Sequence, residues 1–273
     1  MREPIMILAS GVKRVGKTYQ TCHEIQDYIT PKPNQEARKV LIYDVNREYN
    51  DEQIRENGCT WSAKVLDLKD LPAFANQKRV EVRRILAIDE FGQRLGTPKM
   101  VERLNHILQN YRGGMLLLED INKYLVGTSS VDIVGMMATN AHADLDIYIH
   151  LQSLSKLTTT MWQNSAVVRF HKQIDRVKRY EDRLSNPELF FVAQKLVDME
   201  CIKNKRFFVY IYTEENIIKG KFSKKTFQLA CYSYLLDNQK TISATQQRFG
   251  GGIKSRNKAI TYLINDLMKY YGN

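Results

Sequence analysis

The chain has 273 residues, enough for one large α/β domain and a small additional region but not for two full-sized domains. Hydrophobic residues make up 43% and charged residues 26%, and glycine and proline are scarce, which excludes a disordered or fibrous protein. Lysine and arginine outnumber aspartate and glutamate by 41 to 30, a net charge of +11. This charge favours a polyanionic partner, nucleic acid first and an acidic membrane surface second, over a basic protein without such a partner.

Targeting and cysteine patterns add little to this description. The four cysteines are far apart and form no CxxC pair, so neither a zinc site nor a disulfide framework is predicted. No stretch approaches the roughly 18 apolar residues of a membrane span, and the apolar run at 5–9 is too short for a signal peptide. We therefore expect no intrinsic membrane segment and a cytoplasmic location.

Short apolar runs alternate with segments of helical periodicity as far as residue 170. The predicted elements are, in chain order, a strand at 5–9, a helix at 16–29, strands at 40–43 and 80–88, a helix at 100–111, a strand at 115–118, a helix at 131–143, and strands at 145–151 and 166–170. Apolar strands that alternate with helices and end in polar residues predict a mostly parallel sheet with helices on both faces. Ligands of such sheets bind at the carboxyl ends of the strands.

The character of the sequence changes after residue 171. A charged helical segment at 172–203 and a hairpin at 207–211 and 217–222 are predicted, and only helices follow. We divide the chain into an α/β domain at 1–222 and a basic helical C-terminal region at 223–273. Within that region a short helix at 244–249, a glycine turn and a helix from about residue 255 resemble a helix-turn-helix. A helical hairpin that packs on the core with a solvated charged face remains the alternative.

The segment Gly11–Thr18 reads G-V-K-R-V-G-K-T and matches the phosphate-binding motif G-x-x-x-x-G-K-[ST] between a predicted strand and a predicted helix. Its glycines let the backbone wrap a phosphate, to which successive N–H groups and the helix N-terminus present positive potential. Lys17 is expected to reach the β- and γ-phosphate oxygens and Thr18 to offer its hydroxyl to Mg²⁺. The motif predicts a RecA-like P-loop NTPase fold that binds ATP and Mg²⁺ through Gly11, Val15, Gly16, Lys17, Thr18 and Tyr19.

Two acidic pairs follow predicted strands, Asp89–Glu90 and Glu119–Asp120. Hydrolysis needs one carboxylate for the water shell of Mg²⁺ and another to orient or deprotonate the attacking water, and either pair could supply both. We favour Glu119–Asp120, because the next strand then delivers Gln152 beside the nucleotide as a sensor of the γ-phosphate. If Asp89–Glu90 held the magnesium ion instead, Glu119 would fall at the sensor position. Its negative charge would then face the phosphate oxygens, and this repulsion is costly. The predicted catalytic residues are Lys17, Glu119, Asp120 and Gln152, and the predicted metal-binding residues are Thr18, Glu119 and Asp120.

Over residues 4–171 the chain resembles the FtsK/HerA superfamily of P-loop ATPases. The resemblance lies in the phosphate-binding motif, the acidic pair Glu119–Asp120, the segments 41–44, 47–49, 147–153 and 167–170, and Asn164. That superfamily includes viral genome-packaging ATPases, conjugative coupling proteins and Zot-like phage assembly ATPases. The resemblance implies that Glu119 and Asp120 are the Walker B pair and Gln152 the sensor. Their Glu-Asp order departs from the usual Asp-Glu and leaves open which acid is the base.

Members of the superfamily work as rings in which an arginine of one subunit reaches the γ-phosphate held by its neighbour. The resemblance therefore implies a homo-oligomeric ring, hexameric or pentameric, with Arg112 and Arg169 as candidates for that arginine. The predicted function is ATP-dependent translocation of nucleic acid, double-stranded DNA first, in the genome packaging of a virus or mobile element. A Zot-like ATPase that acts at a membrane through a partner, and a nucleotide-dependent switch that barely hydrolyses ATP, remain alternatives.

Overall fold

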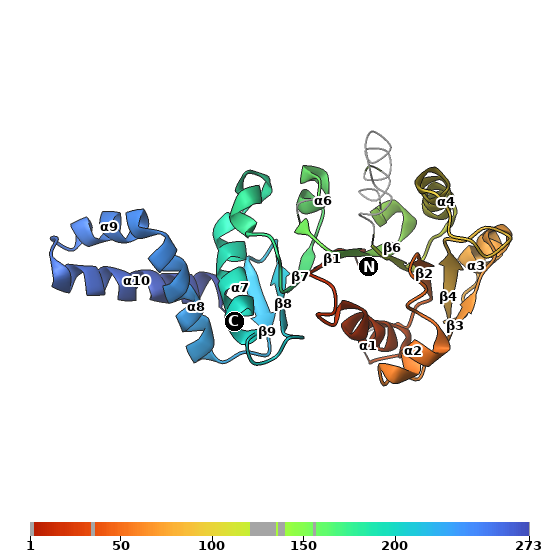
Figure 1. The fold of residues 1–273 in the computed structure, drawn as a ribbon, viewed down its shortest axis with the longest axis horizontal. Helices are drawn as coiled ribbons and strands as arrows, with labels where there is room; N and C mark the ends of the chain where they lie inside the picture. Colours follow the sequence, from red (N-terminus) through yellow and green to blue (C-terminus); the bar gives the residue numbers. More distant parts are fainter. Residues whose placement is uncertain (1–2, 34–35, 121–134, 136–139, 155–156, 273) are drawn as a thin grey trace. The chain divides into compact units, whose positions relative to one another are not determined.

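A computed structural model of the chain describes residues 3–33, 36–120, 135, 140–154 and 157–272 (Figure 1). The described residues group into two compact units. The first comprises those of Met1–Ala9, Gly16–Gln152 and Lys156–Ser165, and the second those of Ser10–Val15, Ser153–Ser155 and Ala166–Asn273. The chain thus passes from one unit to the other inside the phosphate-binding motif, between Val15 and Gly16. The proposed division at residue 222 falls within the second unit.

The first unit is built on a sheet with the strand order β3-β4-β2-β5-β6-β1. The pairs β3/β4, β4/β2, β2/β5 and β5/β6 are all parallel, as predicted. In this register Tyr43 lies opposite Leu118, and Leu118 lies opposite Ile149, so the polar residues that follow these strands meet at one edge. The strands are β1 (Met6–Ser10), β2 (Val40–Asp44), β3 (Ala63–Val65), β4 (Val82–Leu86), β5 (Gly114–Leu118) and β6 (Leu145–Leu151).

Helices cover both faces of this sheet (Figure 1). On one face Ile25 of α1 and Ile54 of α2 share a buried cluster with Ile42 and Leu117 of the strands. On the other face the hydroxyl of Tyr43 donates a hydrogen bond to the carbonyl of Met100 in α4, at 3.1 Å. The helices of this unit are α1 (Lys17–Ile29), α2 (Asp51–Glu56), α3 (Leu71–Asn76), α4 (Thr97–Asn110) and α6 (Thr159–Gln163), with 3₁₀ turns at Leu68–Asp70 and Asn140–Ala143.

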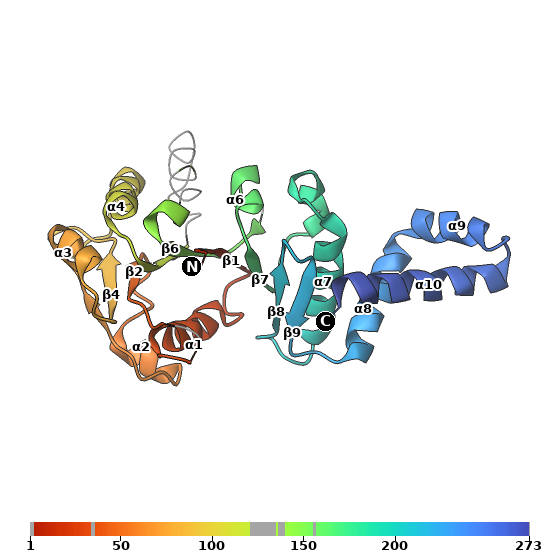
Figure 2. The same cartoon turned by 180° about the vertical axis from the view of Figure 1, so that it is seen from behind.

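The second unit contains an antiparallel sheet with the order β7-β8-β9. Helix α7 packs on β8 and against α8, which in turn contacts α10 (Figure 2). Helix α7 begins after Asn186, whose side chain accepts a hydrogen bond from the N–H of Leu189 and so caps the first turn. The elements are β7 (Val167–His171), a 3₁₀ segment (Val177–Arg183), α7 (Pro187–Glu200), β8 (Phe208–Tyr212), β9 (Ile217–Gly220), α8 (Lys224–Asp237), α9 (Gln239–Arg248) and α10 (Ile253–Tyr271).

All the strands predicted from the sequence, including the hairpin, are present, which confirms the α/β fold. Four short elements were not predicted: α2, β3, α3 and α6. The helix predicted at 131–143 lies largely outside the described residues, and 140–143 form a 3₁₀ turn. Helix α9 begins at Gln239, five residues before the predicted start. No helix in the described part of the chain has the length and apolar character required to cross a bilayer.

Candidate active site

The helix that follows the phosphate-binding motif starts from a left-handed residue. Gly16 has φ 86° and ψ 20°, a conformation that glycine adopts without strain. Lys17 and Thr18 are the first two residues of α1, and both are partly exposed. No side chain caps this helix start and no acid lies in its first turn, so its N–H groups and dipole favour an anion there. Tyr19 is 38% exposed and packs edge-to-face on His23.

The preceding part of the motif belongs to the second unit. A Cβ atom on Gly11 would lie 2.6 Å from Cβ of His171, so this close approach to β7 requires glycine. The N–H of Val12 donates to the carbonyl of Lys172 at 2.9 Å, which fixes the start of the loop. The loop residues from Val12 to Val15 line a hollow of about 440 Å³ that they share with Lys172 and the end of α7.

A carboxylate that follows β2 reaches the start of α1. The hydroxyl of Thr18 donates a hydrogen bond of 2.8 Å to Oε2 of Glu48. The buried carboxylate of Asp44, the last residue of β2, accepts hydrogen bonds from the N–H groups of Glu48 and Tyr49, at 2.9 and 3.2 Å. Arg84 of β4 pairs with the same carboxylate at 3.1 Å. Asp44 therefore holds the loop that presents Glu48 to Thr18.

The acidic pair that follows β5 is buried, with Glu119 2% and Asp120 8% exposed. Asn46 contacts both acids: its N–H donates to Oε2 of Glu119 at 3.0 Å, and its side-chain amide donates to Oδ2 of Asp120 at 2.8 Å. Burial raises the pKa of Glu119 well above its ordinary value, and the carboxylates of Glu48 and Asp44 raise this pKa further. The site therefore concentrates negative charge that a divalent cation would neutralise.

Gln152, the first residue after β6, joins this cluster. Its side-chain amide donates to Oδ2 of Asp120 at 2.8 Å. Two residues earlier on β6, the buried ring of His150 lies 2.8 Å from the hydroxyl of Thr21 in α1. Asp120 has a left-handed φ of 45°, a region in which aspartate and asparagine are enriched. The structure thus brings the predicted residues Glu119, Asp120 and Gln152 together in the first unit.

The oxygen donors of the cluster suit Mg²⁺. Hydroxyl and carboxylate oxygens are hard ligands, and Mg²⁺ in nucleotide sites typically takes one or two protein groups and completes its shell with waters and phosphates. The part of the chain that the structure describes contains no group of three or more His, Cys, Asp or Glu side chains that could hold a metal ion. Thr18, Glu48, which accepts its hydrogen bond, and Glu119, whose pKa is raised by burial and by the Glu48 carboxylate, are residues that could hold the ion or its waters.

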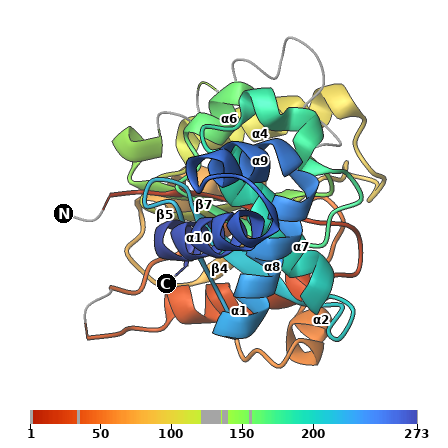
Figure 3. The same cartoon turned by 90° about the vertical axis from the view of Figure 1, so that its left-hand side faces the viewer.

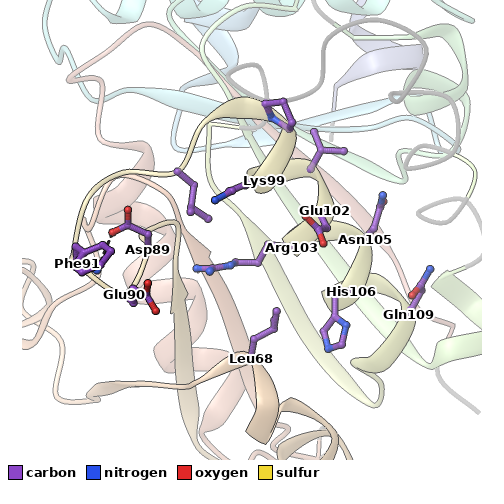
Figure 4. Close-up of a pocket in the computed structure, with 13 residues that line it drawn as sticks. Leu68, Asp89, Glu90, Phe91, Lys99, Glu102, Arg103, Asn105, His106 and Gln109 are labelled. Carbon is purple, nitrogen blue, oxygen red and sulfur yellow. Dashed lines mark hydrogen bonds between the residues drawn. The ribbon is translucent and has the colours of Figure 1, made fainter.

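The alternative acidic pair forms a turn. Asp89 Oδ1 accepts hydrogen bonds from the N–H groups of Phe91 and Gln93, at 3.0 and 2.8 Å, and Glu90 is exposed. Arg103 of α4 reaches toward this loop and donates to the carbonyl of Ile88 at 3.0 Å (Figure 4). The loop and α4 line a hollow of about 850 Å³ at the end of β4, which β2 separates from β5. The Asp89 side chain is thus occupied in stabilising its own turn.

The two arginine candidates differ in exposure. Arg112, just after α4, is exposed to solvent. Arg169 lies in the middle of β7 and is fully buried. A side chain in that position cannot reach a neighbouring subunit without leaving the core, so Arg169 was a wrong candidate for an arginine that acts in trans.

Sequence reasoning did not include Asp44, Asn46 and Glu48 among the site residues. The available signal was the Asp-x-x-x-Glu spacing directly after a buried strand, which was used only for the family resemblance. The spacing alone does not reveal that the loop turns back to Thr18. That path depends on a left-handed residue, Arg47 at φ 61°, and on the two N–H groups held by Asp44.

No protein-family model and no curated protein sequence matches the chain. Among solved structures, it is similar to the genome packaging NTPase B204 of Sulfolobus turreted icosahedral virus 2 in complex with AMP, with a TM-score of 0.50 and 13% identity over 81% of this chain and 98% of that one. It is also similar to B204, the DNA-packaging ATPase of Sulfolobus turreted icosahedral virus, with a TM-score of 0.48 and 14% identity over 80% and 97% of the two chains. The N-terminal domain of zonular occludens toxin from Neisseria meningitidis matches with a TM-score of 0.35 and 15% identity over 62% and 76%.

At such identities the likeness concerns the fold. The similarity to B204 in complex with AMP covers nearly all of that NTPase, and it accompanies a glycine-bearing loop between β1 and α1 and a parallel sheet with helices on both faces. The chain has the α/β fold of the P-loop NTPases.

Proposed function

We propose that the chain is a P-loop ATPase that couples hydrolysis of MgATP to the movement of nucleic acid, as the genome-packaging ATPase of a virus or mobile element. The observation that carries this proposal is the set of contacts at the edge where β2, β5 and β6 end. There Glu48 accepts a hydrogen bond from Thr18, and Asp120 accepts one from Gln152. A hydroxyl at a helix start, buried acids and an oriented amide are the groups that phosphoryl transfer to water requires.

The phosphate-binding motif and these contacts suggest the role of each residue. Lys17 binds the β- and γ-phosphates, together with backbone N–H groups of Gly11, Val15, Gly16 and Tyr19. Thr18, Glu119 and Asp120 serve Mg²⁺ or its water shell, and the ion neutralises charge on the transferred phosphoryl group. Asp120 also orients Gln152 toward the γ-phosphate, a role supported by their 2.8 Å hydrogen bond. The turn contacts of Asp89 support this assignment over the Asp89–Glu90 pair.

Nucleic acid, double-stranded DNA first, is the proposed cargo. The net charge of +11 and the fold shared with a viral genome packaging NTPase support it. We further propose a ring of five or six subunits in which Arg112, being exposed, reaches the neighbour's nucleotide. In this proposal residues 1–222 form the ATPase domain and 223–273 a basic region, in a protein of the host cytoplasm or the virion.

The test is the ATPase rate of the full chain with and without duplex DNA, together with the mass in solution in the presence of nucleotide. We expect DNA to stimulate turnover and nucleotide to favour the ring. Lys17→Ala should abolish MgATP binding or turnover, whereas Lys13→Ala, at an exposed lysine of the same loop, should retain both. An ATPase rate that neither DNA nor RNA changes would contradict the proposed coupling of hydrolysis to nucleic-acid movement. MgATP binding without measurable hydrolysis would favour the nucleotide-dependent switch instead.

A further inference from the structure

Helices α9 and α10 form an antiparallel hairpin within the second unit. Figures 1 and 3 show the two helices side by side, joined by the turn Gly250–Gly252. The turn is fixed by hydrogen bonds from the Gln246 side chain to the carbonyl of Gly252, at 2.9 Å, and from the Ser255 hydroxyl to the carbonyl of Phe249, at 2.8 Å. The inner face is closed by buried residues such as Ile242 and Ala259. The hairpin is therefore a shaped element with a defined outer surface.

The hairpin carries one acidic residue, Asp266 toward the C-terminal end of α10, and is otherwise charged with one sign only. Residues 238–265 contain five lysines or arginines and no aspartate or glutamate. Four of the five, Lys240, Arg248, Lys254 and Lys258, are exposed, whereas Arg256 is partly covered and bonded to Gln239. Lys254 and Lys258 lie one helical turn apart, about 6 Å along the axis, on the same side of α10. A solvated helix face ordinarily mixes both signs, so this surface suits a polyanion.

Apolar side chains are exposed beside these cations. Ile253, the first residue of α10, is 82% exposed, and Phe249 and Tyr262 are 42% and 54% exposed and pack edge-to-face at 5.9 Å. Cations interleaved with exposed aromatic and aliphatic groups are typical of surfaces that contact phosphates while touching sugars or bases. A membrane surface would instead need a continuous apolar face along a helix. Helix α9 has none, since its one large apolar residue, Ile242, is fully buried.

We propose that the tip of this hairpin, Arg248, Ile253, Lys254 and Lys258, is a contact surface for the phosphate backbone of nucleic acid. The inference rests on the proposed function, because it names where the cargo of that ATPase is held. The cations bind phosphates and Ile253 lies against the sugar or base edges between them. Uncharged polar neighbours such as Gln247 and Asn257 can add hydrogen bonds to the backbone.

The test compares the full-length wild type with Arg248→Gln/Lys254→Gln/Lys258→Gln. The matched control is Lys64→Gln/Lys78→Gln/Arg79→Gln, which removes three exposed cations from the first unit. Binding of a mixed-sequence DNA duplex is measured by fluorescence anisotropy over a series of salt concentrations. Because each phosphate contact contributes about 0.9 to the slope of log K against log salt, the hairpin variant should lose about 2 to 3 from this slope. Its affinity in about 0.1 M salt should fall at least tenfold, and the control's by less than threefold.

Ile253→Ala is the second variant, because it changes no charge. It should lower the affinity several-fold and leave the salt slope unchanged. MgATP binding and thermal unfolding, measured for every variant, should match the wild type.

If wild type binds DNA and the hairpin variant binds it equally well, or if both triple variants lose affinity equally, the inference is overturned and the proposed function stands. If wild type binds MgATP but no DNA or RNA, both fail. If the hairpin variant lost binding to phosphatidylserine vesicles but bound DNA as the wild type does, the surface would be a membrane contact instead.

Discussion

The hydroxyl of Thr18 and the carboxylate of Glu48 are joined by a 2.8 Å hydrogen bond that links the first turn of α1 to the loop after β2. In a P-loop protein the threonine at this position offers its hydroxyl to Mg²⁺. Glu48 is therefore a carboxylate at the edge of the proposed metal site, in addition to the acids that end β5. A carboxylate there can accept a proton from a water bound to the ion.

Glu48→Gln should lower kcat for ATP hydrolysis by about 100-fold, the usual contribution of a general base, while the Kd for MgATP changes less than about threefold. The reason is that the amide keeps the hydrogen bond to Thr18 but cannot accept a proton. Glu52→Gln, at an exposed acid in the first turn of α2, is the matched control and should keep wild-type turnover. A variant at position 48 with unchanged kcat would leave Glu119 or Asp120 as the base.

The raised pKa of Glu119 predicts a pH dependence of stability in the nucleotide-free, metal-free chain. Its pKa is higher in the folded chain than in the unfolded chain, where it is about 4.3. Such a group stabilises the fold while protonated, and this contribution is lost as pH rises through the folded-state pKa. Glu119→Gln should therefore unfold at a higher denaturant concentration than wild type near neutral pH. The difference should shrink to zero toward about pH 4. If the stabilities of the two proteins differ by the same amount at every pH, the pKa of Glu119 is not raised in the folded chain.

The contact between Asp120 and Gln152 predicts energetic coupling in catalysis. Asp120→Asn keeps a residue type suited to φ 45° but removes the charge that holds the Gln152 amide. In a double-mutant cycle on kcat with Gln152→Ala, residues that act through one another should show a coupling energy of about 0.5–3 kcal/mol. Additive losses would mean that Gln152 acts independently of Asp120. Asp120→Ala should also lower the melting temperature, because alanine is strained in the left-handed region.

The sequence predicted the sheet well because most of its strands are uninterrupted apolar runs with polar ends, a pattern set by burial on both faces. The sequence also predicted that Asp120 and Gln152 lie close together, because parallel strands end at one edge of the sheet. Residues 51–76 were harder to predict, because α2, β3 and α3 are three to six residues long and show no clear periodicity. The burial of Arg169 was also not foreseeable, since an arginine within an apolar strand can face either solvent or core.

The last prediction concerns the buried carboxylate that holds the Glu48 loop. Asp44 is fully buried, pairs with Arg84 at 3.1 Å and accepts hydrogen bonds from two backbone N–H groups. Asp44→Asn leaves the largely buried Arg84 without its counter-charge, so the free energy of unfolding should fall by about 3 kcal/mol. Asp27→Asn breaks an exposed pair with Lys32 and should cost less than about 1 kcal/mol. Urea unfolding of both variants measures the difference. Because the loop carries Glu48, the Asp44 variant should also lose ATPase activity well below its unfolding temperature, whereas equal stability of the two variants would mean that the buried pair does not hold the loop.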